Sequence, residues 1–341
     1  MPGVRAGAES AARKAANPPN LIRLVPAKGR QPAETTPLPA PSVTCAAAGA
    51  FLCRLAIRKA SQSLVDHANT VRKAMTIAGS DSGGGAGIQA DLKTFAAHGV
   101  YGTSVLTAVT AQNTLEVLAI AEVPEEVIVL EIDGVMSDIG ADAAKTGMLS
   151  SPSIIEVVVD RVEAWGIQNL VVDPVMVAKS GDRLLHQDAV SALRNRLLPI
   201  ALVVTPNIPE AEVLAEMSIE SANEMREAAR KIHALGAKYV VVKGGHSDGQ
   251  PHDLIFDGFE FTLLEGERID TRNTHGTGCT FSAAITANLA NGHDPIDAIA
   301  RAKHYITEAL RASYSIGDGH SPVNHFYALG AIDATHEGGV R

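Results

Sequence analysis

A glycine-rich turn, Asn273-Thr-His-Gly-Thr-Gly-Cys279, stands where an apolar pattern with helical spacing begins. Gly276 and Gly278 permit a tight turn and leave the surrounding backbone N–H groups uncovered. Because the start of a helix also carries positive partial charge, this turn could hold an anion such as a phosphoryl group in transfer. The alternative is an ordinary glycine-containing loop whose helix is capped by Thr277. We call residues 275–279 the second glycine loop.

A first glycine loop, residues 79–87, reads Gly-Ser-Asp-Ser-Gly-Gly-Gly-Ala-Gly between an apolar strand and a helical pattern. It does not match the G-x-G-x-x-G dinucleotide signature with its acidic residue after the second strand. It is not a Walker A loop either, because no Gly-Lys-Ser/Thr follows. Such a loop suits a place where backbone approaches a small ligand, and a plain flexible connection is the alternative.

The elements that must position these loops alternate along the chain from Ala74 onward. Short apolar strands are expected at residues 75–79, 102–109, 169–173, 201–205 and 239–243, and a hairpin at 253–264. Helices are expected at residues 88–98, 125–139, 152–165, 188–198, 221–235, 279–291 and 296–312. This alternation predicts an α/β fold of three layers, with a mostly parallel central sheet and helices on both faces.

Ligands of such sheets bind at the carboxyl ends of the strands. The most distinctive loops follow strands, at residues 79–87, 173–182, 205–210 and 243–247. Lys243 ends a buried strand, where a lysine needs a charged partner, so a nucleotide role is plausible for it.

Composition bounds the function. The net charge of −9 argues against nonspecific binding of nucleic acid, although a nucleotide can still bind through local N–H groups. The three cysteines have neither disulfide nor zinc spacing, which fits a reducing compartment, and no segment reads as a membrane helix. We therefore expect a cytoplasmic protein.

The first 70 residues differ from the rest, with nine Lys/Arg against three Asp/Glu and many prolines. Residues 1–70 are expected to be a disordered, transit-like or mis-started extension, since Met75 stands at the head of the first expected strand. Targeting to an organelle by this extension is the alternative location. A single catalytic domain is expected at residues 74–330, with a tail at 331–341.

Seven stretches in order carry a family resemblance: 79–91, 111–114, 145–149, 173–176 with 178–182, 205–210, 242–246 and 275–279. Together they resemble the hydroxymethylpyrimidine/phosphomethylpyrimidine kinases of thiamine synthesis, in the ribokinase-like superfamily, over about residues 75–329. The resemblance implies two ATP-dependent steps, from the hydroxymethylpyrimidine to its monophosphate and then to its diphosphate. Such transfer depends on placement and charge neutralisation more than on covalent catalysis.

The same resemblance implies roles for the polar residues. Gly276, Thr277 and Gly278 would form the anion hole, and Lys179 could clamp the phosphates of ATP unless it is a solvated lysine. Glu210 would hold Mg²⁺ through water, with Asp173 as a second candidate beside the metal. The alternative for Asp173 is a turn residue before Pro174. The residues expected at ATP or its phosphates are Lys179, Lys243, Thr205 and Asn207.

Cys279 stands where sugar kinases of this superfamily place an Asp as base. A thiol at a helix N-terminus is expected to have a depressed pKa and to form a thiolate. Cys279 could therefore accept the proton of the substrate hydroxyl, or only orient the substrate. The alternative is a small buried residue.

Five residues are carried over to the pyrimidine by the resemblance. Gln112 can donate and accept at the ring-nitrogen and exocyclic-amine edge, and Met148 could lie on the ring face. Val175 would offer a backbone carbonyl, and Ala86 would back the ring. Asp91 is placed at the site, with a solvated helix aspartate as the alternative.

Two other functions remain open from the sequence. A pyridoxal or pyridoxine kinase shares the fold and the nucleotide motifs, and a non-catalytic pyrimidine- or nucleotide-binding protein could use the same fold. Superfamily members often form dimers, so a homodimer is possible. His246, His275 and His320 do not have the spacing of a metal cluster and read as loop or capped histidines.

Overall fold

The computed structural model describes residues 71–176, 188–244 and 252–329. The chain divides into two units, residues 1–66 and 67–341, and every described residue belongs to the second. Lys179, the expected N-terminal extension (1–70) and the C-terminal tail (331–341) lie outside the described residues. No helix of the described part is long and apolar enough to cross a membrane.

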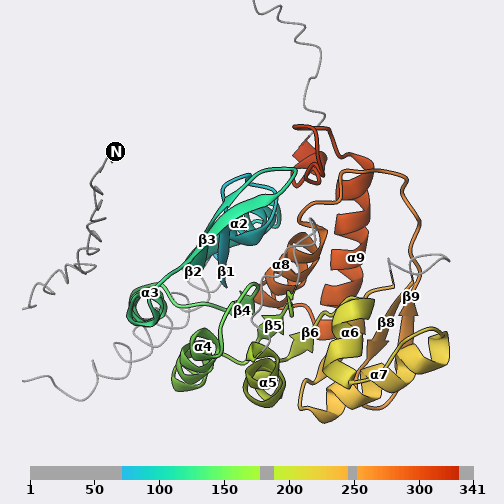
Figure 1. The fold of residues 1–341 in the computed structure, drawn as a ribbon, viewed down its shortest axis with the longest axis horizontal. Helices are drawn as coiled ribbons and strands as arrows, with labels where there is room; N and C mark the ends of the chain where they lie inside the picture. Colours follow the sequence, from blue (N-terminus) through green and yellow to red (C-terminus); the bar gives the residue numbers. More distant parts are fainter. Residues whose placement is uncertain (1–70, 177–187, 245–251, 330–341) are drawn as a thin grey trace, which may run out of the picture. The chain divides into compact units, whose positions relative to one another are not determined.

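The described strands form one nine-stranded sheet in the order β3-β2-β1-β4-β5-β6-β7-β8-β9 (Figure 1). Pairing is parallel from β2 to β7, whereas β3, β8 and β9 pair antiparallel at the two edges. The strands are β1 (Lys73–Asp81), β2 (Tyr101–Gln112), β3 (Val117–Glu122), β4 (Ala143–Thr146), β5 (Leu170–Val172), β6 (Val203–Val204), β7 (Tyr239–Val242), β8 (Asp253–Phe256) and β9 (Phe261–Leu264).

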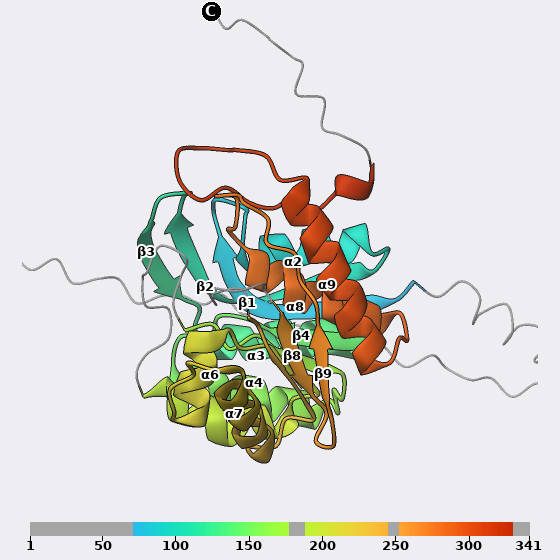
Figure 2. The same cartoon turned by 90° about the vertical axis from the view of Figure 1, so that its right-hand side faces the viewer.

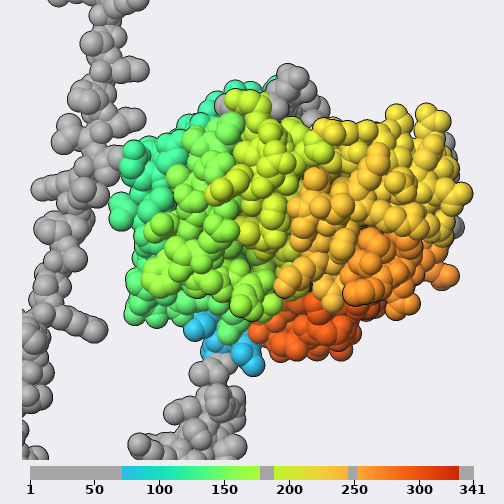
Figure 3. Space-filling view, turned by 90° about the horizontal axis from the view of Figure 1, so that it is seen from below, coloured from blue at the N-terminus to red at the C-terminus, as the bar shows by residue number. Residues whose placement is uncertain are grey.

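The helices cover both faces of the sheet, which confirms the predicted three layers. Their bounds are α2 (Gly87–Ala97), α3 (Glu125–Asp138), α4 (Pro152–Ala164), α5 (Ala189–Ala192), α6 (Ile208–Ala215), α7 (Ala222–Ala234), α8 (Thr277–Ala290) and α9 (Pro295–Arg311). One apolar core lies between the sheet and α3, α4, α6 and α7, and the other between the sheet and α2, α8 and α9. Figure 2 shows α8 and α9 side by side. The green and yellow atoms in Figure 3 belong to the segment that contains α3 to α7.

The short central strands β4 and β5 are completely buried. All three residues of β5 and all four of β4 are buried, so parallel neighbours and helices supply every contact. One of these buried residues is Lys145, an ionisable side chain in a strand that is otherwise small or apolar.

Several elements differ from the prediction. The helix expected at 188–198 is α5 followed by a π-helical turn (Leu193–Leu197) and a 3-10 turn (Leu198–Ile200), where Pro199 cannot continue an α-helix. Edge strand β3 was not predicted, and its residues are nearly all exposed, so its sequence lacks a buried face. Helix α6 was also missed.

The first strand begins before Met75. The backbone N–H of Lys73 donates to Asp142 Oδ2 at 2.8 Å, and its Nζ donates to the carbonyl of Ile139. Ala74 is fully buried. A chain that started at Met75 would therefore lack the first two residues of β1, which corrects the expectation that the strand starts there.

Candidate active site

The two glycine loops meet at the carboxyl end of β1. Gly276 has φ +73°, and a Cβ on it would lie 1.8 Å from the carbonyl oxygen of Gly85. A Cβ on Gly85 would lie 2.4 Å from the ring of His275. Glycine is therefore required at both positions for the loops to touch, and Gly276 also needs it for its left-handed backbone.

The second glycine loop opens α8, as the sequence predicted. Gly276 is the N-cap residue, and Thr277 Oγ1 donates to the carbonyl of Thr274 at 2.5 Å. A Cβ on Gly278 would lie 3.5 Å from Lys243 Nζ and 3.6 Å from Asp173 Oδ2. The N-terminus of α8 therefore faces a lysine and a carboxylate. A phosphoryl group with its counter-ion needs such surroundings.

Asp173 follows β5 directly before Pro174, and its side chain is buried. Its Oδ1 lies 3.3 Å from Lys243 Nζ and accepts from Thr205 Oγ1 at 3.3 Å. Ser282 Oγ donates to its Oδ2 at 3.3 Å. Burial lowers the pKa of Lys243, but Asp173 and then Glu210 outweigh this and raise it, so Lys243 keeps its charge.

Asn207 and Glu210 form a capping box at the start of α6. The N–H of Glu210 donates to Asn207 Oδ1 at 2.9 Å, and the N–H of Asn207 donates to Glu210 Oε2 at 2.8 Å. The sequence prediction considered the pair for metal and phosphate only. The box shows that they also fix the helix start, so part of their hydrogen-bonding capacity is already in use.

The carboxyl of Glu210 is buried close to Asp173. Burial raises its pKa to about 7, Lys243 opposes the rise, and Asp173 adds to it. Two neighbouring carboxylates of this kind fit a divalent cation, whose charge would relieve their mutual repulsion. Among the described residues, no group of three or more His, Cys, Asp and Glu could hold a metal ion. A cation here would therefore need water or substrate phosphate as further ligands.

Cys279 does not have the depressed pKa expected from its place at a helix N-terminus. Burial raises its pKa to about 12, Lys145 opposes the rise, and Asp91 and Asp173 add to it. The N–H of Gly87 is directed at the sulfur. The expectation of a thiolate is therefore wrong for this state of the protein, because the site removes water and adds nearby carboxylates.

Asp91 and Lys145 form an ion pair with both side chains fully buried. Lys145 Nζ lies 2.7 Å from Asp91 Oδ1, and Thr76 Oγ1 donates to Asp91 Oδ2 at 2.6 Å. Burial lowers the pKa of Lys145, but Asp91 outweighs it and the pKa is raised. A solvated Asp91 is therefore excluded, since both its oxygens are engaged inside the protein. Lys145 was missed as a site residue, although a lysine inside a buried strand signals a partner.

The residues predicted to hold a ring lie at neighbouring strand ends. Gln112 ends β2, Met148 follows β4 and Val175 follows β5, while Ala86 is the N-cap residue of α2. The sulfur of Met148 lies 3.2 Å from where a Cβ of Gly79 would be. Because β2, β1, β4 and β5 are parallel neighbours in the sheet, all four residues lie at the carboxyl ends of these strands.

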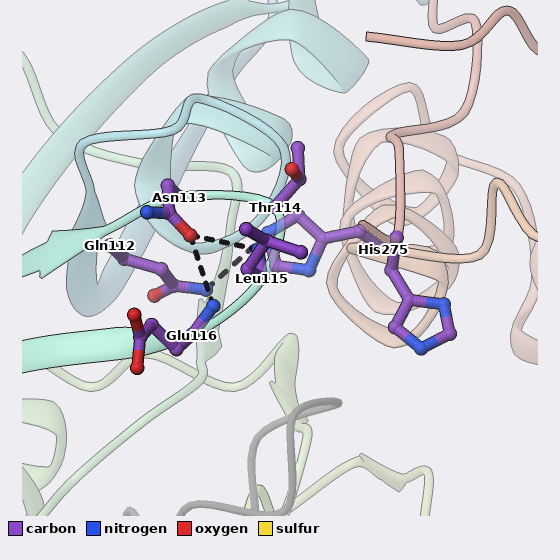
Figure 4. Close-up of a pocket in the computed structure, with 7 residues that line it drawn as sticks. Gln112, Asn113, Thr114, Leu115, Glu116 and His275 are labelled. Carbon is purple, nitrogen blue, oxygen red and sulfur yellow. Dashed lines mark hydrogen bonds between the residues drawn. The ribbon is translucent and has the colours of Figure 1, made fainter. Parts of the chain in front are cut away.

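A small cavity lies beside Gln112 (Figure 4). It is lined by Gln112, Asn113, Thr114, Leu115, Glu116, His275 and His320. His275 of the second glycine loop and the end of β2 therefore line the same cavity. His275 was read from the sequence as a loop histidine and is a further residue that the prediction missed.

Comparison with known proteins identifies the family. A model of the family described as phosphomethylpyrimidine kinase matches residues 81–324. The chain belongs to the phosphomethylpyrimidine kinase family. It is therefore a phosphotransferase, which confirms the predicted resemblance and enzyme class.

Curated relatives of this kinase include hydroxymethylpyrimidine/phosphomethylpyrimidine kinases. That of Rhizobium meliloti is 52% identical over 258 residues, covering 74% of this chain and 97% of the relative. That of Bacillus subtilis is 46% identical over 259 residues, covering 75% and 96%. The bifunctional thiamine biosynthesis protein ThiED of Geobacter sulfurreducens is 52% identical over 255 residues, and the chain spans about half (52%) of its length.

Solved structures confirm the fold. The ADP complex of Bacillus subtilis pyridoxal kinase has a TM-score of 0.72 at 42% identity, covering 76% of this chain and 100% of the other. Phosphomethylpyrimidine kinase of Clostridium difficile has a TM-score of 0.64 at 44% identity, covering 70% and 99%. Both kinds of kinase thus share the sheet and helices of this one.

Proposed function

We propose that this kinase transfers a phosphoryl group from ATP to the hydroxymethyl oxygen of a hydroxymethylpyrimidine, and then a second to the resulting monophosphate. The observation that supports this most is the meeting of the second glycine loop with Lys243 and Asp173. The loop offers N–H donors, Lys243 a positive charge, and Asp173 a carboxylate for a cation. The curated relatives that the chain covers almost completely carry this activity in their names.

In this proposal Gly276, Thr277 and Gly278 surround the transferring phosphoryl group. Lys243 neutralises its negative charge from the other side of the turn. Glu210 and Asp173 would hold Mg²⁺, largely through water, and the ion would screen the phosphate oxygens. Asn207, Thr205 and Lys179 complete the predicted ATP site.

The substrate ring is proposed to lie between the first glycine loop and the ends of β2 and β4. Ala86 backs the ring, Met148 lies on its face, and Gln112 and Val175 supply hydrogen bonds at its edge. Asp91 supports the site without binding the ring, because Thr76 and Lys145 already occupy both of its carboxylate oxygens. Cys279, a neutral thiol by its raised pKa, orients the hydroxymethyl group.

A product assay by mass tests the reaction. The full chain, the hydroxymethylpyrimidine, ATP and Mg²⁺ should yield first the monophosphate and then the diphosphate. Consumption of ATP without either product would refute the proposed substrate. Cys279→Ser, which keeps a small polar group, should retain more turnover than Cys279→Ala, while both keep the KM for ATP. Equal full turnover of the two variants would leave Cys279 as a packing residue.

Pyridoxal is the second candidate substrate. It is favoured by the similarity to solved pyridoxal kinases at 42% identity for Bacillus subtilis and 39% for Staphylococcus aureus. Identities of 46% and 52% to curated pyrimidine kinases favour the pyrimidine. A competition assay with both rings separates the two, and a higher kcat/KM for pyridoxal would reverse the assignment.

A further inference from the structure

His275 forms a side-chain link between the two glycine loops. Its Nε2 lies 2.9 Å from Asp81 Oδ2. The same carboxylate accepts from the N–H groups of Gly83, Gly85 and Ala86 at 2.8, 3.0 and 2.8 Å. A carboxylate with so many donors is an acceptor, so Nε2 of His275 carries the proton and donates it to Asp81.

Both partners are held rigidly. Asp81 and His275 are buried, and burial raises the pKa of Asp81 while His275 and the N–H donors outweigh it and lower the pKa. The backbone N–H of His275 donates to the carbonyl of Ser321 at 3.1 Å, which fixes the start of the second glycine loop. The ring packs on Gly85, where a Cβ would lie 2.4 Å from Cδ2. The link therefore sets one separation between the loops.

The same ring contacts the residue proposed for the substrate edge. Nε2 of His275 lies 3.4 Å from Nε2 of Gln112. Because the Nε2 proton goes to Asp81, this nitrogen has no lone pair with which to accept from the Gln112 amide. Thr110 Oγ1 lies 3.2 Å from Gln112 Oε1, and its one proton is also directed at the carbonyl of Ser80, 2.9 Å away. The amide N–H groups of Gln112 are thereby left available for an acceptor nitrogen on a heteroaromatic ring.

We propose that the Asp81–His275 pair is a positioning pair that holds the ring-backing loop at a fixed distance from the transfer turn and keeps the Gln112 amide donors for the substrate. Neither side chain takes part in the chemistry. The pair acts through Ala86 on one loop and Cys279 on the other. This inference rests on the proposed function, because it assumes that an acceptor ring lies between those two residues.

The physical consequence is a cost in turnover rather than in nucleotide binding. A misplacement of about 1 Å between reacting atoms can lower a rate by about 100-fold. Lys243 follows β7, and Asn207 and Glu210 open α6, so none of these nucleotide groups belongs to either of the two glycine loops that the link joins. Loss of the link should therefore change kcat and discrimination between rings, while the KM for ATP stays constant.

Three variants of His275 test this. His275→Phe keeps an aromatic ring but no donor, His275→Asn has a donor too short to reach Asp81, and His275→Gln places an amide N–H near the former Nε2. His98→Phe is the matched control. His98 is another histidine with a hydrogen bond, to the carbonyl of Thr94, but it is only partly buried and lies at the C-terminal end of α2, away from the first glycine loop.

With the hydroxymethylpyrimidine as acceptor, His275→Phe and His275→Asn should lower kcat by about 10- to 100-fold. They should also lower the preference for the pyrimidine over pyridoxal. His275→Gln should recover most of both losses, and the KM for ATP should stay within about twofold in all variants that fold. Thermal unfolding midpoints identify a variant that fails to fold, and the Asn and Gln variants then decide the outcome.

Unchanged kcat in His275→Phe or His275→Asn would overturn the inference. So would an equal loss in His275→Gln, since that would mean that the donor to Asp81 is not what matters. If wild-type protein does not phosphorylate the pyrimidine, the proposed substrate fails, and the same variants measured with pyridoxal still test the link. The two failures are therefore distinguishable.

Discussion

Replacement of Glu210 by Gln in metal-free protein should change how stability depends on pH. Glu210 is the third residue of α6 and 7% exposed. Burial raises its pKa from 4.5 to about 7, despite the opposing charge of Lys243. Gln occupies the same volume and can complete the capping box with Asn207, so the variant removes the titration and leaves the helix start in place.

The magnitude follows from the shift of about 2.5 pKa units between 4.5 and 7. Each unit corresponds to about 1.4 kcal/mol, so the full effect is on the order of 3 kcal/mol. Between pH 4.5 and 7 the unfolded state has released the Glu210 proton and the folded state still binds it. Stability therefore falls as the pH rises through this window, and the contribution is fully present below the unfolded pKa.

Thermal unfolding in EDTA at pH 5 and pH 7.5 measures the effect. The Tm of Glu210→Gln minus that of wild type should be about 6–12 °C larger at pH 7.5 than at pH 5. Glu224→Gln is the control, because Glu224 occupies the same third position of α7, where hydrogen bonds from the N–H of Glu220 and from Ser221 lower its pKa. Mg²⁺ should stabilise wild type at pH 7.5 more than the Glu210 variant. Parallel pH profiles for wild type and Glu210→Gln would refute the reasoning.

Three further changes are predicted from the same contacts. Gly276→Ala should lower kcat at least about 10-fold, because the new Cβ would meet backbone atoms. Gly292 also has a left-handed backbone but faces open space, so Gly292→Ala should cost only about 1–2 kcal/mol of stability. Equal losses of activity in the two variants would contradict this. Lys145→Met would leave the Asp91 carboxylate buried without a cation, so urea unfolding should show a loss of about 3–5 kcal/mol in stability. A loss below about 1 kcal/mol would show that the ion pair is not held as described. A chain that begins at Met75 should be less stable by roughly 2 kcal/mol than one that keeps all of β1, because it loses the hydrogen bonds of Lys73. Thermal unfolding compares the two chains. Equal midpoints would mean that Lys73 and Ala74 contribute nothing to stability.

The sequence predicted the layered fold because periodicity reports burial. Six of the seven expected helices agree with the structure to within about two residues, since each carries an apolar face toward one of the two cores. Strand β3 has no such face, so its residues give no pattern of a buried strand. Its place follows from pairing with β2, which no local pattern encodes. Strand β6 lies inside the strand expected at 201–205 but is only two residues long.

The site was predictable where a loop follows a strand and not where two distant loops touch. Glycines 276 and 278 could be placed at a helix start from local sequence. The pairs Asp81–His275 and Asp91–Lys145 join residues 194 and 54 positions apart, so only the fold brings them together. Cys279 shows the same limit, since a helix N-terminus alone predicts a lowered pKa.

The raised pKa of Cys279 bears on how the substrate hydroxyl loses its proton. In a loose transition state for phosphoryl transfer, little bond to the attacking oxygen has formed, so its proton can leave late. A strong base is then less important than the distance between the hydroxyl oxygen and the phosphorus. Cys279 is suited to fixing that distance, because the N–H of Gly87 is directed at its sulfur and the Asp91–Lys145 pair lies close to it. Both glycine loops thus contribute to one task, which is to hold a neutral hydroxyl group at the N-terminus of α8.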